Sequence, residues 1–598
     1  MKTRNLKPSL LVKWIVLLLV LGRLLSPVGA LAGGTWTGLG APDQIWLMLL
    51  LSNGNILCEN NPTGDLGSGY GSDWYILIPD NQGSYANGTF VSAASANDSR
   101  HFFSSQVLPN GNVYAAGGEY GTGDSTAELF DSLANGGLGS WTYINPPTSI
   151  FNPTAPANNA FTDAQSMLLP DGTVLEAPIH GQTGSQTLIY NPTLNNWSNG
   201  APSLAWQAEV SWVKLADGSI LTVDPLNPGT GTNSERYIPS LGRWIPDANL
   251  PVQLWVNIAA ANLVGETGPA FLLPNGKAFY LGGSGHTAIY TPSPLGGTNQ
   301  GVWTQGPDIP DGLAGADAPG CMLPNGKILC EFAPLYYVDS GGLEINDGLV
   351  FYEYDYTEGP TGSFNLVSSP PSADEYAGYN TCMLALPNGQ VLYSQVDQNE
   401  AFANDDTVLY IYTPDGSQLT AGQPVIKSIT MNPDGSYHLV GTGLNGLSQG
   451  AAFGDDAQMD SNYPLVRFTD DSGRTLYGRT YNWSSTGVQT GTNLVTTEFT
   501  LPPLETGGGT LSLVVTANGI SSDSVTIDGP VWVDFNYSPS SPQLGLYSTP
   551  FSTLAQGTDV VAQGGTISLK PGASSETPRI ATAMTLKAVG GTVVIGRQ

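Results

Sequence analysis

The side chains that most often bind metals or attack substrates are rare in this sequence. Its 598 residues include only four histidines, His101, His180, His286 and His438, and only four cysteines. No Cys-x-x-Cys pair and no histidine-rich stretch occurs, so the spacing that a zinc site needs is missing. The sequence therefore contains no zinc motif.

Two of the cysteines could form a pair. Cys321 and Cys330 flank the Asn325-Gly326 turn symmetrically, so we expect them to face each other across a hairpin. An exported protein could form a disulfide there, although the cross-strand geometry can be strained. The alternative is two buried free thiols, which behave as small apolar side chains. The sequence leaves both interpretations open.

The acidic residues give two further hypotheses. The stretch Asp455-Asp456-Ala-Gln-Met-Asp460 offers carboxylates, which are the oxygen ligands that Ca²⁺ prefers. It lacks the full ligand spacing of a calcium loop, so a solvated turn is the preferred interpretation. A carboxylate pair for glycoside hydrolysis cannot be picked out, because the separation of the two groups in space decides that chemistry.

Charge and the N-terminal residues indicate an exported protein. Residues 1–32 combine five basic residues and no acidic one with the apolar run Trp14–Leu21 and the small-residue motif Ala30-Leu31-Ala32. This is the pattern of a signal peptide cleaved after about Ala32. The remaining chain has 14 basic against 49 acidic residues, a net charge of −35. Such a surface argues against nucleic acid and anionic membranes as partners. We expect a secreted or cell-surface protein with no membrane span in the mature chain.

A strand–turn–strand motif recurs along the chain. Apolar runs flank an Asn-Gly or Asp-Gly pair, which is the strongest short-range hairpin signal, and we expect positive φ at both turn residues. The pairs are Asn53-Gly54, Asn110-Gly111, Asp171-Gly172, Asp217-Gly218, Asn275-Gly276, Asn325-Gly326 and Asn388-Gly389. Their spacing of 46 to 63 residues is typical of propeller blades. The sequence predicts seven blades.

The second half of most repeats supports four strands per blade of the kelch type. An apolar strand ends in an aromatic residue, and a later strand carries a tryptophan, as in Tyr190 with Trp197 and Tyr290 with Trp303. We interpret these tryptophans as packing between blades. The seventh repeat has no later tryptophan strand, whereas Thr35-Trp36-Thr37 resembles one. We therefore predict that the N-terminus completes the last blade and closes the ring, which removes exposed sheet edges.

The pattern changes after about Gln423. Alternating strands at sandwich spacing continue to about Gly529, and very short strands between glycine turns follow, with a possible short helix over 554–562. We predict an all-β protein: a signal peptide (1–32), a seven-bladed kelch propeller (33–420), an immunoglobulin-like sandwich (421–529) and a short β-helix-like tail (530–598). Because one or two rungs cannot bury a solenoid core, the tail should dock on its neighbour or be partly mobile.

At this point the sequence resembles a known family. A seven-bladed kelch propeller followed by an immunoglobulin-like sandwich is the plan of the galactose oxidase and glyoxal oxidase group, the copper radical oxidases. The resemblance covers about residues 35–529. Its more specific part is Gly454–Phe468 with Arg479–Val488, which is similar to the C-terminal domain of that group. The resemblance implies that a loop of this domain reaches back to the propeller axis.

The resemblance also implies where a copper site would lie. The family holds copper with two tyrosines and two histidines, and one tyrosine is cross-linked to a cysteine. The matching positions here are Phe102, Tyr379, Asn380 and Trp483, and no cysteine occurs near Ile45 or Trp46. Phenylalanine and tryptophan do not ligate copper. His101 would restore one imidazole if the alignment shifted by one residue.

The expected function follows from this altered site. We expect a secreted, non-catalytic protein without a cofactor that binds a carbohydrate or protein ligand at the axial face of the propeller. The expected binding residues are Phe102, Tyr379, Asn380, Trp483 and His101, since aromatic faces and an amide suit sugar rings. The alternatives are a copper-dependent oxidase of primary alcohols or aldehydes that releases hydrogen peroxide, and a structural cell-surface or matrix protein.

Overall fold

The computed structural model describes most of the chain after the predicted leader. The described residues are 33–60, 71–151, 165–177, 186–205, 207, 210–224, 233–258, 263–338, 343–344, 348–396, 407–453, 457–502, 508, 510–529 and 531–596. The predicted signal peptide (1–32) and residues 454–456, which include Asp455 and Asp456 of the acidic stretch, lie outside them. No helix within the described residues is long and apolar enough to cross a membrane.

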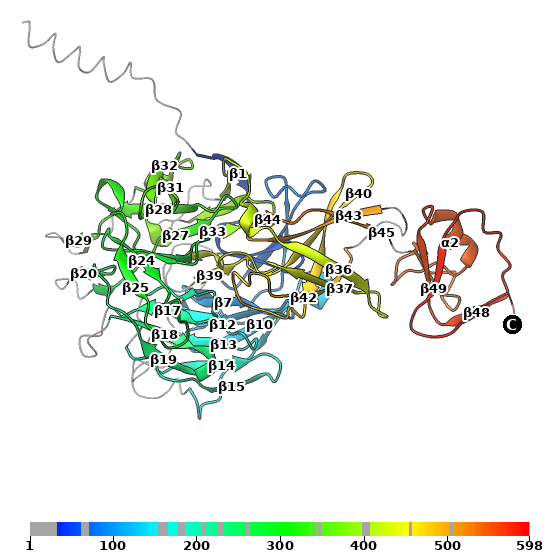
Figure 1. The fold of residues 1–598 in the computed structure, drawn as a ribbon, viewed down its shortest axis with the longest axis horizontal. Coiled ribbons are helices and arrows are strands. Elements are labelled where there is room, and N and C mark those ends of the chain that lie inside the picture. Colours follow the sequence, from blue (N-terminus) through cyan, green and yellow to red (C-terminus); the bar gives the residue numbers. More distant parts are fainter. Residues whose placement is uncertain are drawn as a thin grey trace, which may run out of the picture.

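Seven antiparallel blades form the propeller: six are four-stranded sheets, and the four strands of blade 6 belong to a larger, seven-stranded sheet (Figure 1). Blade 1 consists of β2 (Ile45–Leu50), β3 (Ile56–Asn60), β4 (Trp74–Ile78) and β5 (Thr89–Ser92). Blade 2 consists of β7 (Ser104–Val107), β8 (Val113–Ala116), β10 (Ala127–Asp131) and β11 (Ser140–Tyr143). Blade 3 consists of β12 (Gln165–Leu168), β13 (Val174–Ala177), β14 (Leu188–Asn191) and β15 (Asn196–Asn199). Blade 4 consists of β16 (Val213–Lys214), β17 (Ile220–Val223), β18 (Ser234–Ile238) and β19 (Arg243–Pro246). Blade 5 consists of β22 (Ala270–Leu272), β23 (Ala278–Leu281), β24 (Thr287–Thr291) and β25 (Val302–Gln305). Blade 6 consists of β27 (Pro319–Met322), β28 (Ile328–Pro334), β31 (Val350–Asp355) and β32 (Ser363–Leu366). Blade 7 consists of β33 (Thr381–Ala385), β34 (Val391–Gln395), β35 (Val408–Thr413) and β1 (Thr35–Gly40). The predicted all-β fold with seven blades is confirmed.

Short strand pairs decorate the propeller. They are β6 (Arg100–His101) with β9 (Tyr120–Gly121), β20 (Val256–Ile258) with β21 (Leu263–Gly265), β29 (Tyr337–Val338) with β30 (Leu343–Glu344), and β26 (Leu313–Ala314) beside β28.

The predicted hairpin turns exist, but their geometry differs from the expectation. Only the glycine of each pair has positive φ, between 79° and 88°, and none of the preceding Asn or Asp residues does. In blade 5 the amide of Gly276 donates to the carbonyl of Leu273 at 2.9 Å, and the amide of Lys277 donates to Oδ1 of Asn275 at 3.1 Å. This is a type I turn followed by a glycine bulge. The Asn or Asp therefore contributes a side-chain acceptor instead of a left-handed backbone.

The bulge corrects the expected cysteine pair. It shifts the register by one residue, so Cys321 lies opposite Leu329 and Cys330 lies opposite Gly320. Side chains one register position apart point to opposite faces of a sheet. The two thiols accordingly belong to different apolar clusters, and both are free and buried. The prediction that the cysteines face each other was wrong, and the free-thiol alternative is confirmed.

The N-terminal strand closes the ring as predicted. β1 pairs with β35 over six residues, from Thr35 opposite Thr413 to Gly40 opposite Val408. The indole N–H of Trp36 donates to the carbonyl of Ser368 in blade 6 at 2.6 Å. Trp141 and Trp303, on the outermost strands of blades 2 and 5, donate to the preceding blade in the same way. The tryptophans thus join neighbouring blades, and Trp36 plays this role for the last one.

Buried glutamates also join neighbouring blades. Glu176 of β13 accepts hydrogen bonds from the hydroxyls of Ser104 and Tyr114 in blade 2, at 2.9 and 3.0 Å. Glu331 of β28 accepts one from Thr381 in blade 7 at 2.8 Å. Burial raises the pKa of each glutamate to about 8. Both carboxyl groups are therefore largely protonated at neutral pH.

A hairpin from the second part of the chain enters the propeller. β38 (Gly450–Phe453) pairs with β39 (Ala457–Asp460) and with the innermost strand β27 of blade 6, where Pro319 lies opposite Phe453. The hairpin also contacts the innermost strands of blades 1, 2, 5 and 7. It therefore occupies the propeller axis, in the place that the resemblance implied for a returning loop.

Apart from the β38–β39 hairpin, the strands between blade 7 and Asp528 form one curled antiparallel sheet around an apolar core. In spatial order they are β36 (Val425–Met431), β37 (Tyr437–Thr442), β42 (Val495–Thr500), β41 (Thr475–Tyr481), β40 (Leu465–Asp470), β43 (Thr510–Ala517) and β44 (Ile520–Ser521), with β45 (Val525–Asp528) beside β43. Strand β41 changes partner along its length, since Gly478 lies opposite Val466 of β40 and Arg479 lies opposite Thr500 of β42. The immunoglobulin-like description stays a prediction.

The tail contains parallel strands in the manner of a solenoid. Two parallel sheets stack successive strands: β46 (Val531–Val533), β47 (Thr566–Leu569) and β49 (Thr585–Ala588) in one, β48 (Gly572–Ser574) and β50 (Val593–Ile595) in the other. Helix α2 (Leu554–Val560) starts at a capping box formed by Thr553 and Gln556. Figure 1 shows the tail beyond the curled sheet. Leu546 packs against the core of that sheet, so the tail docks on its neighbour.

The turn geometry predicts that glycine is required for its positive φ and not because a side chain would lack space. Gly172 has φ +82°, and a Cβ there would meet only Pro109 at 3.9 Å. We expect Gly172→Ala to lower the free energy of unfolding by about 1–2 kcal/mol because alanine disfavours the left-handed region. Urea unfolding measures the change. The matched control is Gly40→Ala, where φ is ordinary and nothing lies within 4 Å; an equal loss in both variants would contradict the assignment.

The raised pKa values of Glu176 and Glu331 predict a pH dependence of stability. In the pH range between 4.5 and 8 the folded protein binds more protons at these groups than the unfolded chain, so their stabilisation is present at low pH and is lost as pH rises. We expect Glu176→Gln and Glu331→Gln to reduce that loss between pH 5 and 8 by an amount on the order of 3 kcal/mol each. Urea unfolding at several pH values tests this against exposed Glu375→Gln. Identical pH slopes in all proteins would contradict it.

Candidate site at the axial end of the propeller

The site is built where the innermost strands of the blades begin, at the end of the propeller opposite the glycine turns. Before β7 the chain forms the short strand β6, which pairs with β9 so that His101 lies opposite Tyr120. Phe102 follows with φ 52°, an unusual backbone for a bulky residue. Glu119 closes this loop, since its amide donates to the carbonyl of His101 at 2.8 Å.

A buried arginine holds this loop in place. Both Arg100 and Glu128 are almost fully buried, and Nη2 of Arg100 lies 2.9 Å from Oε1 of Glu128. Nη1 of Arg100 also donates to the carbonyls of Gly117, Gly123 and Thr126 at 2.7 to 2.9 Å. The guanidinium therefore fixes both sides of the loop that presents His101 and Phe102.

Four rings form an aromatic cluster at this end. The ring centroids of Trp46 and His101 are 4.8 Å apart, and those of Trp46 and Phe102 are 5.4 Å apart in an edge-to-face arrangement. Tyr120 lies 6.1 Å from Phe102. Burial lowers the pKa of His101 to about 3, so its imidazole is neutral at physiological pH. Phe102 and Tyr120 are half-buried and keep part of their surface in solvent.

Carboxyl groups from other blades complete the site. Glu266 and Asp317 lie just before the innermost strands of blades 5 and 6, with φ values of 45° and 49°. Asp317 hydrogen-bonds with Glu266 and accepts a hydrogen bond from the hydroxyl of Tyr336 at 3.0 Å. Burial raises the pKa of Asp317. Two carboxyl groups that bond to each other must share a proton, so this pair can both donate and accept.

The two groups of residues meet across the axis. Burial raises the pKa of Glu119, which also keeps exposed surface at the rim, and the nearby charge of Asp317 acts in the same direction. Tyr379 interacts electrostatically with Tyr336. Side chains of blades 2, 5, 6 and 7 thus approach one another at one axial end.

The sequence-predicted residues do not all lie there. His101, Phe102 and Tyr379 lie at the axial end, and Trp46 contacts the first two. Asn380 is buried beside Tyr379, and its Oδ1 has no hydrogen-bond partner among the described residues. Trp483 lies at the other end of the blades, as described next.

The expectation that Trp483 converges on this site is corrected by the structure. Its ring stacks on Tyr463 at 4.4 Å, its indole N–H donates to Thr480, and the amide of the preceding Asn482 donates to the carbonyl of Pro109 at the glycine turn of blade 2. The physical reason is that β41, which precedes Trp483, docks on the turn end of the propeller. The hairpin that does enter the axis is β38–β39.

These residues do not fit copper. Phe102 has no ligand atom, Trp483 lies at the turn end, and Asn380 offers a neutral amide; of the four positions only Tyr379 has a phenol that could ligate the metal. Among the described residues, no group of three or more His, Cys, Asp and Glu side chains is arranged to hold a metal ion. The donor set therefore lacks the imidazoles that fix copper in such centres.

Sequence reasoning missed the carboxyl groups. Glu119 follows a Gly-Gly pair, and Glu266 and Asp317 precede Gly-Pro and Ala-Pro dipeptides in loops before an innermost strand. Each lies directly beside its dipeptide or one residue away from it, and this repeated loop position could have been noticed in the sequence. Their proximity could not, because they come from different blades.

Comparison with known proteins gives a fold similarity. A solved structure of a fungal alcohol oxidase of the AA5 family, in complex with copper, has 11% sequence identity and a TM-score of 0.46, over 83% of this chain and 99% of that chain. No protein-family model matches the chain, and no curated protein matches it. A similarity of this size says nothing about the activity of this chain.

The loop that presents the site should depend on the buried ion pair. We expect Arg100→Gln to lower the free energy of unfolding by about 3–5 kcal/mol, because it leaves the Glu128 carboxylate buried and unpaired. Urea unfolding measures this loss. The double variant Arg100→Gln/Glu128→Gln should recover part of it, since no charge is then buried. A loss below about 1 kcal/mol in the single variant would contradict the positioning role.

Proposed function

We propose that this protein is a secreted binding protein that recognises a carbohydrate at the axial end of its propeller. The observation that supports the proposal most directly is the meeting of half-exposed rings with carboxyl groups from several blades. Phe102 and Tyr120 supply the rings, and Glu119 and Asp317 supply the acids. A site made by loops of several blades can contact a ligand from several sides.

The chemistry of these groups suits a sugar. One face of a pyranose ring consists of C–H groups that pack on an aromatic side chain, whereas its hydroxyls need donors and acceptors around the rim. The Asp317–Glu266 pair can supply both, because it shares a proton, and the Tyr336 hydroxyl extends the polar edge. His101 stays neutral and buried behind Phe102, where it supports the ring and carries no charge.

Backbone strain supports a functional role for the same residues. Phe102, Glu266 and Asp317 are three of the non-glycine residues with positive φ in the described chain, and all three stand just before an innermost strand. Such backbone costs on the order of 1–3 kcal/mol per residue and persists where the surrounding structure fixes it. A purely structural surface would gain nothing from placing bulky and acidic residues in this conformation.

The proposal also includes that the protein is exported and that it functions without a cofactor. The leader pattern and the net charge of −30 of the full chain support secretion or display at the cell surface. The alternative of a copper-dependent oxidase has weaker support, because three of the four positions that the resemblance assigns to the metal carry Phe, Asn and Trp. A structural role would leave the half-exposed rings without a ligand.

Glycan binding tests the proposal. The purified mature protein is applied to a glycan array, and the best glycan is then titrated by calorimetry. We expect Phe102→Ala and Asp317→Asn each to weaken the affinity at least roughly tenfold, which corresponds to about 1.4 kcal/mol. Tyr143→Phe is the matched control, since Tyr143 lies on the outermost strand of blade 2 and is exposed; it should bind like the unchanged protein.

Two outcomes would contradict this function. No binding on the array would exclude the glycans tested and favour a protein ligand or a structural role. Stoichiometric copper after loading, with hydrogen peroxide released from galactose or glyoxal, would establish the oxidase alternative and require a ligand set other than Phe102, Asn380 and Trp483.

A further inference from the structure

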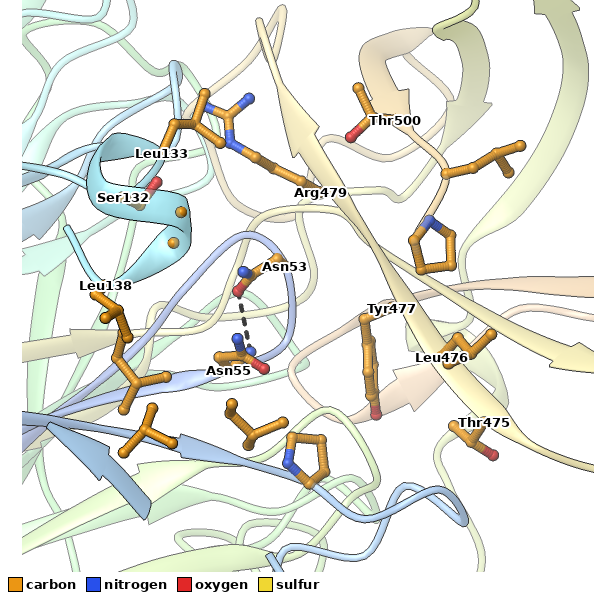
Figure 2. Close-up of a pocket in the computed structure, with 18 residues that line it drawn as sticks. Asn53, Asn55, Ser132, Leu133, Leu138, Thr475, Leu476, Tyr477, Arg479 and Thr500 are labelled. Carbon is orange, nitrogen blue, oxygen red and sulfur yellow. Dashed lines mark hydrogen bonds between the residues drawn. The ribbon is translucent and has the colours of Figure 1, made fainter. Parts of the chain in front are cut away.

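A second site lies at the opposite end of the propeller, in a cleft between blades 1 and 2 and the curled sheet. The cleft has a volume of about 520 Å³, which is within the range of small-molecule sites. Figure 2 shows its walls: the Asn53–Asn55 turn, the loop with Leu133 and Leu138, and the strand that carries Tyr477 and Arg479. None of these residues belongs to the axial site.

The walls of the cleft are fixed by main-chain contacts. The amide of Thr475 donates to the carbonyl of Asn81 at 2.8 Å, and the amide of Thr480 donates to that of Ser52 at 3.0 Å. The amide of Asn55 donates to Oδ1 of Asn53 at 3.1 Å, which is the dashed contact in Figure 2. Strand β41 is therefore anchored on the turn end at two points, and the cleft is formed before a ligand arrives.

The exposed lining is slightly more apolar than polar, and three of its large apolar side chains are accessible. Leu133, Leu138 and Ile78 are exposed to 59, 43 and 38%, which is unusual for large apolar side chains that face one cleft. The ring of Tyr477 packs on Gly54, where a Cβ would come within 2.4 Å of the ring. These surfaces would gain by contact with an apolar ligand.

One cation stands in this apolar cleft. Arg479 is half-buried, and burial lowers its pKa, whereas the nearby Tyr481 and Asp131 act in the opposite direction. Within the described part of the chain it forms no direct ion pair with a carboxylate. Its Nη2 donates to the carbonyl of Asn110, its guanidinium lies 5.1 Å from the ring of Tyr481, and its buried Nε has no hydrogen-bond partner. An unpaired buried donor on a charged group costs free energy that an acceptor from a ligand would recover.

We propose that this cleft binds a small amphipathic carboxylate, with an aryl or alkyl body. The carboxylate would accept from Arg479, because guanidinium and carboxylate match in shape and charge. The body would lie between Leu138 and Tyr477. In a chain with 14 basic residues after the leader, a half-buried guanidinium beside exposed leucines, with Asp131 nearby but not in a direct ion pair, selects an anion that also has an apolar part.

Calorimetric titration with 4-phenylbutyrate and its neutral amide tests the site in the full-length mature protein. We expect the carboxylate to bind with a Kd below about 1 mM and the amide to bind at least roughly tenfold more weakly. Arg479→Gln should weaken carboxylate binding by about 10- to 100-fold and remove the preference over the amide. Exposed Arg243→Gln, on the outermost strand of blade 4, is the matched control and should bind like the unchanged protein.

Replacing Arg479 also removes its hydrogen bond to the carbonyl of Asn110, so a second variant tests the site without changing Arg479. Leu138→Glu places a like charge in the cleft at an exposed position, and it should weaken carboxylate binding more than amide binding. Equal binding of acid and amide, unchanged binding in Arg479→Gln with normal thermal unfolding, or no binding of the acid at roughly 10 mM would each overturn the proposal.

Discussion

The pairing of β1 with β35 is the contact on which the propeller depends. It joins segments 378 residues apart, as in the hydrogen bond from the amide of Gly34 to the hydroxyl of Tyr412. Closing a loop of that length costs about 5 kcal/mol of chain entropy. Packing of Trp36 on Phe351, Tyr393 and Tyr412 offsets part of this cost. Without β1, strand β35 would be an open edge.

Closure gives the propeller two unlike ends. At the axial end the loops before the innermost strands converge, and the β38–β39 hairpin occupies the axis, so the side chains there lie over a filled centre instead of an open channel. At the turn end the glycine bulges present carbonyls to the curled sheet, and β41 docks on them. The two candidate sites differ in character for this reason: one is acidic and aromatic, the other apolar with one cation.

Two buried carboxyl groups show different ways of compensating charge inside the molecule. Glu128 is paired with the buried guanidinium of Arg100, whereas Glu176 is protonated and hydrogen-bonded. Both arrangements avoid an uncompensated buried charge. Arg479 differs from Arg100 because its guanidinium donates to a carbonyl and lies near Asp131 without a direct ion pair among the described residues. That difference distinguishes the cleft from the Arg100–Glu128 contact.

The sequence by itself determined the all-β class, the seven repeats, the closing strand and the tryptophan positions, because these depend on local turn chemistry and on alternation that repeats along the chain. It did not determine the turn type, since Asn-Gly suits both a two-residue turn and a glycine bulge, and the bulge moved Cys321 and Cys330 to different faces. Only the tertiary structure placed Glu119 near Asp317 and separated Trp483 from Phe102. Contacts between blades and the docking of β41 depend on packing across hundreds of residues, and no local pattern encodes that distance.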